Sequence, residues 1–494
     1  MAALVGVDVG TSAVKVLATT EDGRQIASES EFYDLITPQP GYVEQAADVV
    51  YLATMRVLAR VLADVRLRGS EIDAIGISSA MHGVLAVDAN GEPLSHLITW
   101  MDRRSAAVAD AWRADGTGLA LYRKTGAPMH PMLPIAKLRW MAEHDTAVFA
   151  RAARFVGLKE LIVFRWTGEW IVDQGIASAT GLFDLRTRTW DGDALGLARI
   201  DAKRLSTPLV TSTTLRDFRP AVATALGLGT KTAVVLASSD GALANLGIGA
   251  TRSDREALTL GTSGAVRVVS DQPVFDDAAR TFCYVFDDTR YLVGGPTSSA
   301  GAALAWIFDL LLPDVPEDDR FAFAVKAATE IEPGAQGVVV LPFLSGERAP
   351  LWMSELRGTI EGLDLAHDRR HIIRAAFESV IFGLFSVHEL VRERLGSPRE
   401  ILLSGGLTKA PLVRSLVANI FGLPASLPNE GEASAFGAAM MAAHAIGALS
   451  SLDGVTTFLH EEARDEPDPG LVARYAGLYA RYQSRLGAIV PLYR

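Results

Sequence analysis

Short apolar runs separated by polar turns open the chain, and they predict a meander of β-strands. Leu4 to Val7, Val14 to Leu17 and Gln25 to Phe32 have strand-like composition, and Glu21-Asp22-Gly23 is typical of a turn. Apolar residues at helical spacing then predict a helix from about Ala47 to Arg68. The opening segment therefore predicts a mixed α/β fold.

Elements of both kinds follow along the rest of the chain. We expect strands at 74–78, 233–236, 257–259, 265–268 and 401–403, a hairpin turn at 88–91, mostly helical structure from 105 to 167, and helices beginning at about 301, 409 and 433. The acidic, proline-containing stretch from His460 to Pro469 is predicted to be a surface loop before a last helix. A boundary between Gly241 and Arg255 divides the chain, and we predict one domain at residues 1–247 and a second at 248–494.

One short phrase occurs twice, once in each half of the chain. Asp8-Val9-Gly10-Thr11-Ser12, followed by Lys15, stands between two strand-like runs, and Leu260-Gly261-Thr262-Ser263-Gly264 stands between two others. Glycine lets the backbone approach a phosphate closely, and successive N–H groups with Thr and Ser hydroxyls can point at its oxygens. A P-loop or a dinucleotide fingerprint needs a helix after the glycines, whereas strands follow here. The duplication predicts two phosphate-binding turns of an ATP-dependent phosphotransferase, with an ordinary hairpin as the alternative for each copy.

Composition and charge narrow the class of protein. The 494 residues are 49% hydrophobic and 21% charged, and the net charge of −11 argues against nucleic acid as a main partner. Cys283 is the single cysteine, so an internal disulfide is excluded, and its neighbours Phe282 and Tyr284 favour a small buried hydrophobe over a reactive thiol. We see no signal-peptide pattern and no apolar run long enough to span a bilayer, and we expect a cytoplasmic protein without a membrane partner.

Phosphoryl transfer to an alcohol needs a phosphate cradle, a metal ion, a base and exclusion of water. Asp8 is the natural carboxylate to hold Mg²⁺, and Lys15 could neutralise charge on the leaving oxygens. Asp240 follows a predicted strand and is flanked by small residues, which suits a fixed catalytic base. The alternative for Asp240 is a helix N-cap, and the sequence alone does not decide between the two.

Other polar residues also stand at predicted strand ends. Met81-His82-Gly83 and Asp102-Arg103-Arg104 are two such groups, but a lone histidine is commonly a packing residue and adjacent charges are commonly a solvated pair. If the arginines face a cleft, one guanidinium could bind a carboxylate in bidentate geometry. Trp100 could form an apolar wall under a sugar or belong to the core. Gly405-Gly406 suits close approach to a nucleotide or a tight turn.

The residues then match a known family. Met132-Leu133-Pro134 with Lys137, Trp140 and His144 forms one signature, and Gly358 through Gly362 with His371, Ala375 and Glu378 forms another. Together with Gly346-Glu347-Arg348-Ala349-Pro350, they show that the chain resembles the FGGY carbohydrate kinases from Val5 to about Ala443. The resemblance implies an α/β fold of two duplicated, ribonuclease H-like domains, as in actin, hexokinase and Hsp70, with a cleft between the lobes.

The resemblance also implies roles for residues that match the family's motifs. It implies ATP and Mg²⁺ as cofactors, Asp240 as the base, and Asp8 with Asp240 near the metal. The first domain would carry the sugar site and the second the adenosine site. Implied nucleotide-binding residues are Gly10, Thr11, Ser12, Lys15, Gly261, Thr262, Ser263, Gly301, Gly405 and Gly406, with Lys409 close by. Implied sugar-binding residues are Met81, His82, Trp100, Asp102 and Arg103, to which we add His130 as a hypothesis.

Within the family, the chain is most similar to the gluconate kinases. The supporting stretches include Ser78 to His82 and Thr125 to Pro131. Xylulose kinases typically carry Gln in place of Ala80 and Asn in place of Gly241. The expected reaction is phosphorylation of the terminal hydroxyl of gluconate to give 6-phosphogluconate. Arg103, Arg104, His82 and His130 are all candidates to bind the substrate carboxylate, and the sequence does not choose among them.

Two alternatives remain at this point. One is a kinase of a neutral ketose or polyol such as xylulose. The other is a nucleotide-gated switch of the actin and Hsp70 type, which would carry no small-molecule pocket. The sequence leaves a homodimer open.

Overall fold

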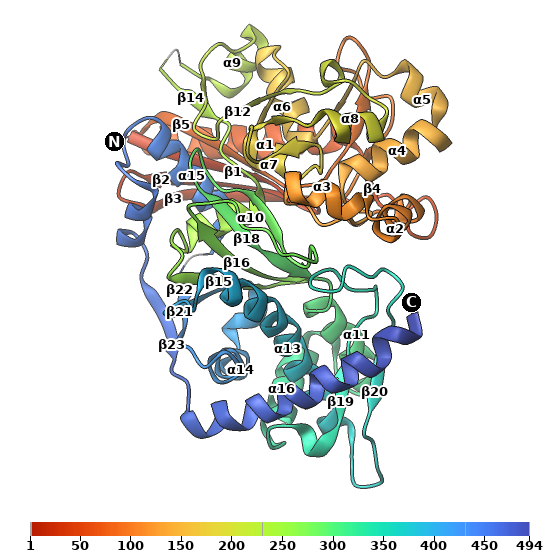
Figure 1. Cartoon of the computed structure of the whole chain (residues 1–494). Coiled ribbons are helices and arrows are strands. Elements are labelled where there is room, and N and C mark those ends of the chain that lie inside the picture. The colour runs from red at the N-terminus through yellow and green to blue at the C-terminus, as the bar shows by residue number, and fades with distance from the viewer. Residues whose placement is uncertain (1, 230, 430, 494) are drawn as a thin grey trace. The chain divides into compact units, whose positions relative to one another are not determined.

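The computed structural model describes residues 2–229, 231–429 and 431–493. The described residues fall into two compact units (Figure 1). The first takes those of Met1–Thr251, Val269–Val293 and Glu430–Leu459, and the second takes those of Arg252–Val268, Gly294–Asn429 and His460–Arg494. The sequence division at residue 247 stays a prediction.

The first unit is built on a six-stranded sheet with the order β13-β14-β5-β1-β2-β3. Its strands are β1 (Ala2–Val9), β2 (Ala13–Thr20), β3 (Gln25–Phe32), β5 (Glu71–Ser79), β13 (Thr214–Leu215) and β14 (Ala233–Val235). β1 is parallel to β5 and antiparallel to β2, and β14 is parallel to β5. The described side chains of β1 are almost all buried, as expected for a central strand with helices on both faces.

Two helices cover the opposite faces of this sheet. Val5, Val7 and Val9 point into the core that α1 (Ala47–Leu67) closes, whereas Gly6 points the other way, because side chains alternate along a strand. On the Gly6 face lies α15 (Ala433–Ala445) (Figure 1). The helix is so close that a Cβ atom at Gly6 would stand 1.7 Å from the carbonyl oxygen of Ala435. The glycine therefore allows α15 to pack directly on the strand backbone.

The remaining elements of the first unit are short. The segment predicted to be mostly helical contains α2 (Ala106–Ala114), α3 (Thr117–Thr125), α4 (Pro134–His144), α5 (Thr146–Arg151) and α6 (Leu158–Thr167), with β8 (Arg154–Val156) before the last. The others are β4 (Glu44–Gln45), β6 (Leu85–Val87), β7 (Leu97–Ile98), β9 (Ile171–Asp173), α7 (Gln174–Ser178), β10 (Phe183–Asp184), β11 (Thr189–Trp190), α8 (Gly192–Ala198), β12 (Thr207–Leu209), α9 (Pro220–Leu226), α10 (Asp240–Gly247) and the 3₁₀ turns 202–204 and 452–457. The hairpin turn predicted at 88–91 is confirmed by the bond from Gly91 N to Asp88 O.

A seven-stranded sheet has the order β17-β18-β16-β15-β21-β22-β23. Its strands are β15 (Arg255–Leu260), β16 (Gly264–Ser270), β17 (Phe282–Val285), β18 (Tyr291–Thr297), β21 (Glu400–Ser404), β22 (Ala425–Pro428) and β23 (Glu461–Asp465). β15 is parallel to β21 and antiparallel to β16, and β21 is parallel to β22. Outside this sheet, the second unit contains α11 (Gly301–Leu311), α12 (Arg320–Thr329), β19 (Val339–Leu341), β20 (Thr359–Glu361), α13 (Arg369–Leu395), α14 (Pro411–Phe421), α16 (Pro469–Ile489) and the 3₁₀ turns 317–319, 335–337, 406–409 and 490–493 (Figure 1).

One predicted element is wrong. The stretch after His460 is not a loop, because Glu461–Asp465 forms β23 and pairs antiparallel with β22. An edge strand tolerates such a charged sequence, since one side of it faces no neighbouring strand. The last helix, by contrast, is confirmed as α16. Within the described residues, the structure holds no helix with the length and apolar character needed to cross a membrane.

Candidate active site

Two carboxylates lie near each other at one edge of the first sheet. Asp8 stands near the end of β1, where its Oδ1 accepts a hydrogen bond of 2.6 Å from the Ser78 hydroxyl on β5. Asp240 follows β14, whose end is held beside β5 by a bridge between Ser79 and Ser239. Burial, and next the charge of Asp240, raise the pKa of Asp8 to about 6. An anionic pair of this kind is stabilised by a cation placed near it.

Asp240 does not cap its helix. The cap of α10 is Ser239, whose hydroxyl accepts from the N–H of Ala242, so the N-cap alternative for Asp240 is wrong. Asp240 is the first residue of α10, and its Oδ1 accepts a bond of 2.7 Å from the N–H of Gly241. The positive end of the helix dipole favours the ionised carboxylate there.

The structure confirms that the first glycine turn joins two paired strands, and its role in binding phosphate stays a prediction. It closes with a bond from Gly10 N to Ala13 O, and side chains hold its carbonyls. Tyr33 donates its hydroxyl to Gly10 O at 2.6 Å, and Gln45 donates its amide to Thr11 O at 2.6 Å. The position of the turn is therefore fixed by groups outside it.

Lys15 lies directly opposite Asp8 in the antiparallel register of β1 and β2. Its ammonium is 2.7 Å from Oε2 of Glu432, which immediately precedes α15. Ser434, in the first turn of α15, donates to the carbonyl oxygen of Asp240 at 3.2 Å. Sequence reasoning missed Glu432 and Ser434, and their only signal is a polar stretch just before an apolar helix.

Two neighbouring pockets of the first unit share Ser79, Ala80, Gly83 and Leu158. We call the pocket at the first glycine turn the outer pocket and the other, whose lining includes His82, Glu160, Thr180 and Trp190, the inner pocket. The outer pocket is lined by Gly10, Thr11, Gln45, Ser79, Ala80, Met81, Gly83, Leu97, Thr99, Trp100 and Leu158. Met81 and Trp100 thus come together with the first glycine turn, and the indole N–H of Trp100 donates to the Thr11 hydroxyl at 2.9 Å. Trp100 is half-buried and forms a pocket wall rather than core.

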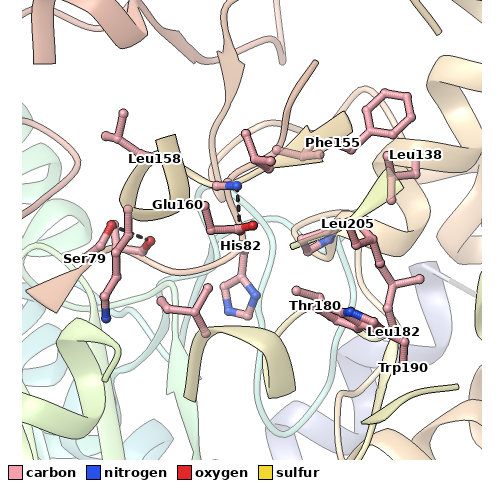
Figure 2. A pocket seen from close by; sticks show the side chains of 18 residues that line it. Ser79, His82, Leu138, Phe155, Leu158, Glu160, Thr180, Leu182, Trp190 and Leu205 are labelled. Carbon is pink, nitrogen blue, oxygen red and sulfur yellow. Dashed lines mark hydrogen bonds between the residues drawn. The ribbon is translucent and has the colours of Figure 1, made fainter. Parts of the chain in front are cut away.

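His82 points into the inner pocket (Figure 2). In this view Ser79 lies to one side of the pocket, Thr180 and Trp190 lie to the other, and Glu160 and His82 lie between them. His82 has a left-handed backbone with φ of 66°, which is unusual outside glycine, and its Nδ1 lies 2.7 Å from Ala179 O. Burial raises the pKa of Glu160 to about 7.

Asp102, Arg103 and His130 are not among the residues that line these two pockets in the described part of the chain. Asp102 is buried, and its carboxylate accepts bonds from the N–H of Val43 and from the backbone and guanidinium of Arg104. The N–H of Arg103 is bonded to Gly41 O, and His130 Nδ1 accepts from the N–H of Met132. Their contact with a sugar stays a prediction.

Arg104 is not one of a solvated charge pair. Its side chain is 7% exposed, forms ion pairs with Asp102 and Glu44, and stacks on the ring of Tyr42. These contacts employ the guanidinium within the fold, which argues against Arg104 as the partner of a substrate carboxylate.

The second glycine turn lies in the second unit and is backed by a helix. Its closing residues Leu260 and Gly264 are paired in the register of β15 and β16. The first N–H groups of α11 donate to this turn, from Gly301 to Gly261 O at 3.0 Å and from Ala302 to Thr262 O at 3.0 Å. The predicted Gly261-Thr262-Ser263 and Gly301 are therefore brought together.

Gly405 lies against the same turn. Its φ of 93° is a backbone conformation that favours glycine. A Cβ atom at this position would stand 2.3 Å from Leu260 O, which leaves no room for another residue. Gly406, in contrast, has open space where a Cβ would stand, and Lys409 ends the 3₁₀ turn that Gly406 begins.

The prediction that Cys283 is a small buried hydrophobe is confirmed, because the thiol is buried and burial raises its pKa to about 12.

Comparisons with known proteins identify the family of both halves of the chain. Residues 3–247 match the N-terminal domain and residues 257–446 the C-terminal domain of the FGGY family of carbohydrate kinases. A gluconokinase of Bacillus subtilis (strain 168) is 34% identical over 471 residues, which cover 94% of this chain and 91% of the relative.

Two solved structures from Lactobacillus acidophilus match closely, a gluconate kinase and a ligand-bound xylulose kinase. Each has a TM-score of 0.95 and 32% identity, and each match covers 100% of this chain and 99% of the other. The fold alone therefore does not choose the sugar. Both halves of the sequence nevertheless match one family, and the chain belongs to the FGGY family of carbohydrate kinases.

Proposed function

We propose that this carbohydrate kinase transfers the γ-phosphoryl group of Mg·ATP to the terminal hydroxyl of D-gluconate and forms 6-phosphogluconate. Membership in a family of carbohydrate kinases decides against a nucleotide-gated switch. The gluconokinase relative, together with Ala80 and Gly241 where xylulose kinases typically carry Gln and Asn, supports gluconate over xylulose.

The observation that carries the proposal is the placement of Asp240. Asp240 is the first residue of α10 and lies beside the ends of β5 and β14. The outer pocket lies at the same end of β5, where Ser79 and Ala80 line it. In the proposed step the substrate hydroxyl gives its proton to Asp240 as its oxygen bonds to the γ-phosphorus. The bond from that phosphorus to the bridging oxygen of ADP breaks.

The residues present fit a divalent cation. Asp8 is a carboxylate of raised pKa that feels the charge of Asp240, and Mg²⁺ commonly uses one or two protein carboxylates and several waters. Asp8 and Asp240 would hold it, and the ion would offset the negative charge of the phosphates. Lys15, opposite Asp8, adds a positive charge on the same strand pair.

The sugar is proposed to lie in the outer pocket, against Met81 and Trp100. Arg103, His82 and His130 remain the candidates for the gluconate carboxylate, since Arg104 is bound to Asp102 and Glu44. We further propose a cytoplasmic enzyme, where ATP is present and the single thiol of Cys283 stays reduced. A homodimer stays a prediction.

ADP release from Mg·ATP, measured with gluconate, xylulose, ribulose, glycerol, other aldonates and no sugar, tests the substrate. We expect strong stimulation by gluconate alone. Stimulation by a neutral sugar instead would contradict the gluconate proposal and leave the kinase chemistry in place.

The Asp240→Asn variant tests the base. We expect kcat to fall by about 10² to 10⁴, the range for removal of a general base, while the affinity for ATP changes little. Ser239→Ala is the matched control, because it removes the cap of the same helix and leaves the carboxylate. Near-normal turnover of the Asp240→Asn variant would show that another group accepts the proton.

A further inference from the structure

Two lysines of the first unit are buried beside the proposed site, although the proposed chemistry uses neither. The whole side chain of Lys137 on α4 is 0% exposed, and that of Lys159 on α6 is 3% exposed. Burying an ammonium group is costly unless the protein supplies partners for it. The partners of these two lysines therefore indicate what each of them does.

Lys137 joins the two chain segments that form walls of the outer pocket. Its ammonium donates to His82 O at 2.7 Å and to Thr99 O at 2.7 Å, with Ile98 O at 3.4 Å. Met81 directly precedes His82, and Trp100 directly follows Thr99. A single lysine amine thus holds together the backbones that carry Met81 and Trp100.

Lys159 holds a different segment. Its ammonium lies 2.7 Å from Oδ2 of Asp173 and donates to Ser238 O at 2.9 Å. Ser238 stands two residues before Asp240, in the short connection between β14 and α10. Asp173 is itself fixed, because its Oδ1 accepts from the N–H of Ile176 and caps α7. The pair therefore anchors the segment that carries the proposed base.

We propose that Lys137 and Lys159 are positioning residues with separate tasks, Lys137 fixing the walls of the sugar pocket and Lys159 fixing the segment that carries Asp240. The inference rests on the proposed function. Neither lysine lines the outer pocket, where the sugar is proposed to lie. Each acts through backbone carbonyls of the segments that carry the proposed site residues.

The two tasks predict opposite kinetic effects for the same substitution. In Lys137→Met the walls lose their common anchor, so we expect KM for the sugar to rise about tenfold or more with kcat within about threefold. In Lys159→Met the base is misplaced, so we expect kcat to fall about 10- to 100-fold with KM for the sugar within about threefold. Each variant is the matched control of the other, since both remove one buried ammonium group and keep the aliphatic stem.

Two further variants distinguish loss of positioning from loss of folding. Lys159→Met leaves the Asp173 carboxylate buried without its partner, so the double variant Lys159→Met/Asp173→Asn removes both charges and should fold more readily. We expect it to show the same loss confined to kcat. Lys137→Arg keeps a cation that can donate to carbonyls, and we expect it to restore most of the affinity for the sugar.

The outcomes separate the inference from the proposed function. If the wild-type protein phosphorylates another sugar, the gluconate proposal fails, and the same kinetic split measured with that sugar still tests the lysines. If folded variants at both positions change kcat and KM in the same proportion, or change neither, the separate tasks are refuted. Opposite splits, as stated, would support them.

Discussion

The two sheets share one order and direction of strands, which we call the frame. They differ in the side chains at equivalent positions of that frame. In the first unit β1 lies between parallel β5 and antiparallel β2, and in the second β15 lies between parallel β21 and antiparallel β16. The outer strands follow in the same order, with β14 and β13 corresponding to β22 and β23. A glycine turn joins the two central antiparallel strands in each unit.

Equivalent positions of the two frames hold different chemical groups. Asp8 is paired with Ser78 and Lys15 in the first frame, and Thr259 is paired with Ser404 and Ala265 in the second. The serine is common to both, and it bonds to Asp8 at 2.6 Å and to Thr259 at 2.9 Å. The carboxylate and the ammonium are present only in the first. The centre of the first frame is therefore a carboxylate, whereas the centre of the second is a neutral hydroxyl that accepts a bond of 3.1 Å from the guanidinium of Arg267.

Among the contrasts between the two frames, the largest expected effect comes from substituting the central residue of each frame. Asp8→Asn removes the carboxylate proposed to hold the metal, and we expect kcat to fall by about 10² to 10³, as for loss of one charge-stabilising group. Thr259→Val is the matched change in the second frame, and we expect less than about a tenfold loss. Steady-state kinetics at saturating Mg·ATP measure both. Equal losses would show that the two frames share the chemistry evenly.

The two glycine turns are also supported differently, which predicts a second contrast. The side chains of Tyr33 and Gln45 hold the first turn, whereas the N-terminus of α11 holds the second. A Cβ at Gly301 would stand 2.5 Å from Gly261 O, so Gly301→Ala must push the helix and the turn apart. We expect KM for ATP to rise about tenfold and Tm to fall.

Gly406→Ala is the control for that experiment, because its Cβ would meet open space. We expect its Tm to stay within about one degree of the wild type. If Gly406 also lies against the nucleotide, as predicted from the sequence, KM for ATP rises without a change in Tm. An unchanged KM for ATP would remove Gly406 from the nucleotide site.

Removing the serine common to both frames should have a smaller effect. Ser78→Ala takes a hydrogen bond from a charged group, and such bonds are worth about 1.5 to 3 kcal/mol, against about 1 kcal/mol for a neutral one. We therefore expect Ser78→Ala to lower kcat/KM by about tenfold and Ser404→Ala by no more than about threefold. Kinetics of the two variants side by side test this order, and a larger loss for Ser404→Ala would reverse it.

Local patterns were enough to predict the parts of the site that lie close together in the sequence. The strand meander, both glycine turns and the strand before Asp240 each depend on a few consecutive residues, and the structure confirms these elements. The pairing of Lys15 with Glu432 could not be predicted, because it joins residues 417 positions apart through the packing of α15 on β1. No periodicity in the sequence predicts a contact between residues so far apart.

The partners of buried polar side chains could not be predicted from the sequence either. Arg104 reads as half of a surface pair, and only the fold brings Glu44 and the ring of Tyr42 to it. Lys159 reads as an ordinary helical lysine, since its partners Asp173 and Ser238 come from separate segments. The charged stretch after His460 was predicted to be a loop because polarity dominates its sequence, whereas edge pairing with β22 makes it a strand.

The smallest expected effect is the dependence of stability on pH that Asp8 causes. Asp8 is the carboxylate that the first frame has and the second lacks. Asp8 has a pKa of about 6 in the folded protein and an ordinary value of 3.8 when unfolded. Between these values the native state keeps a proton that the unfolded state has lost, so Asp8 makes stability fall as pH rises from about 4 to 6. A shift of about two units corresponds to about 3 kcal/mol, and partial solvent contact reduces this to about 1 to 2 kcal/mol.

Thermal unfolding with a chelator, from pH 4 to 7, measures this effect as the difference between wild type and Asp8→Asn. The difference cancels the titration of carboxylates that do not interact with Asp8, and Thr259→Val should keep the wild-type slope because its frame position does not titrate. We expect Asp8→Asn to gain stability relative to wild type as pH rises to 6 and to hold that gain above it. A constant difference across the range would mean that Asp8 titrates normally. The asymmetry between the frames would then be one of shape and not of charge.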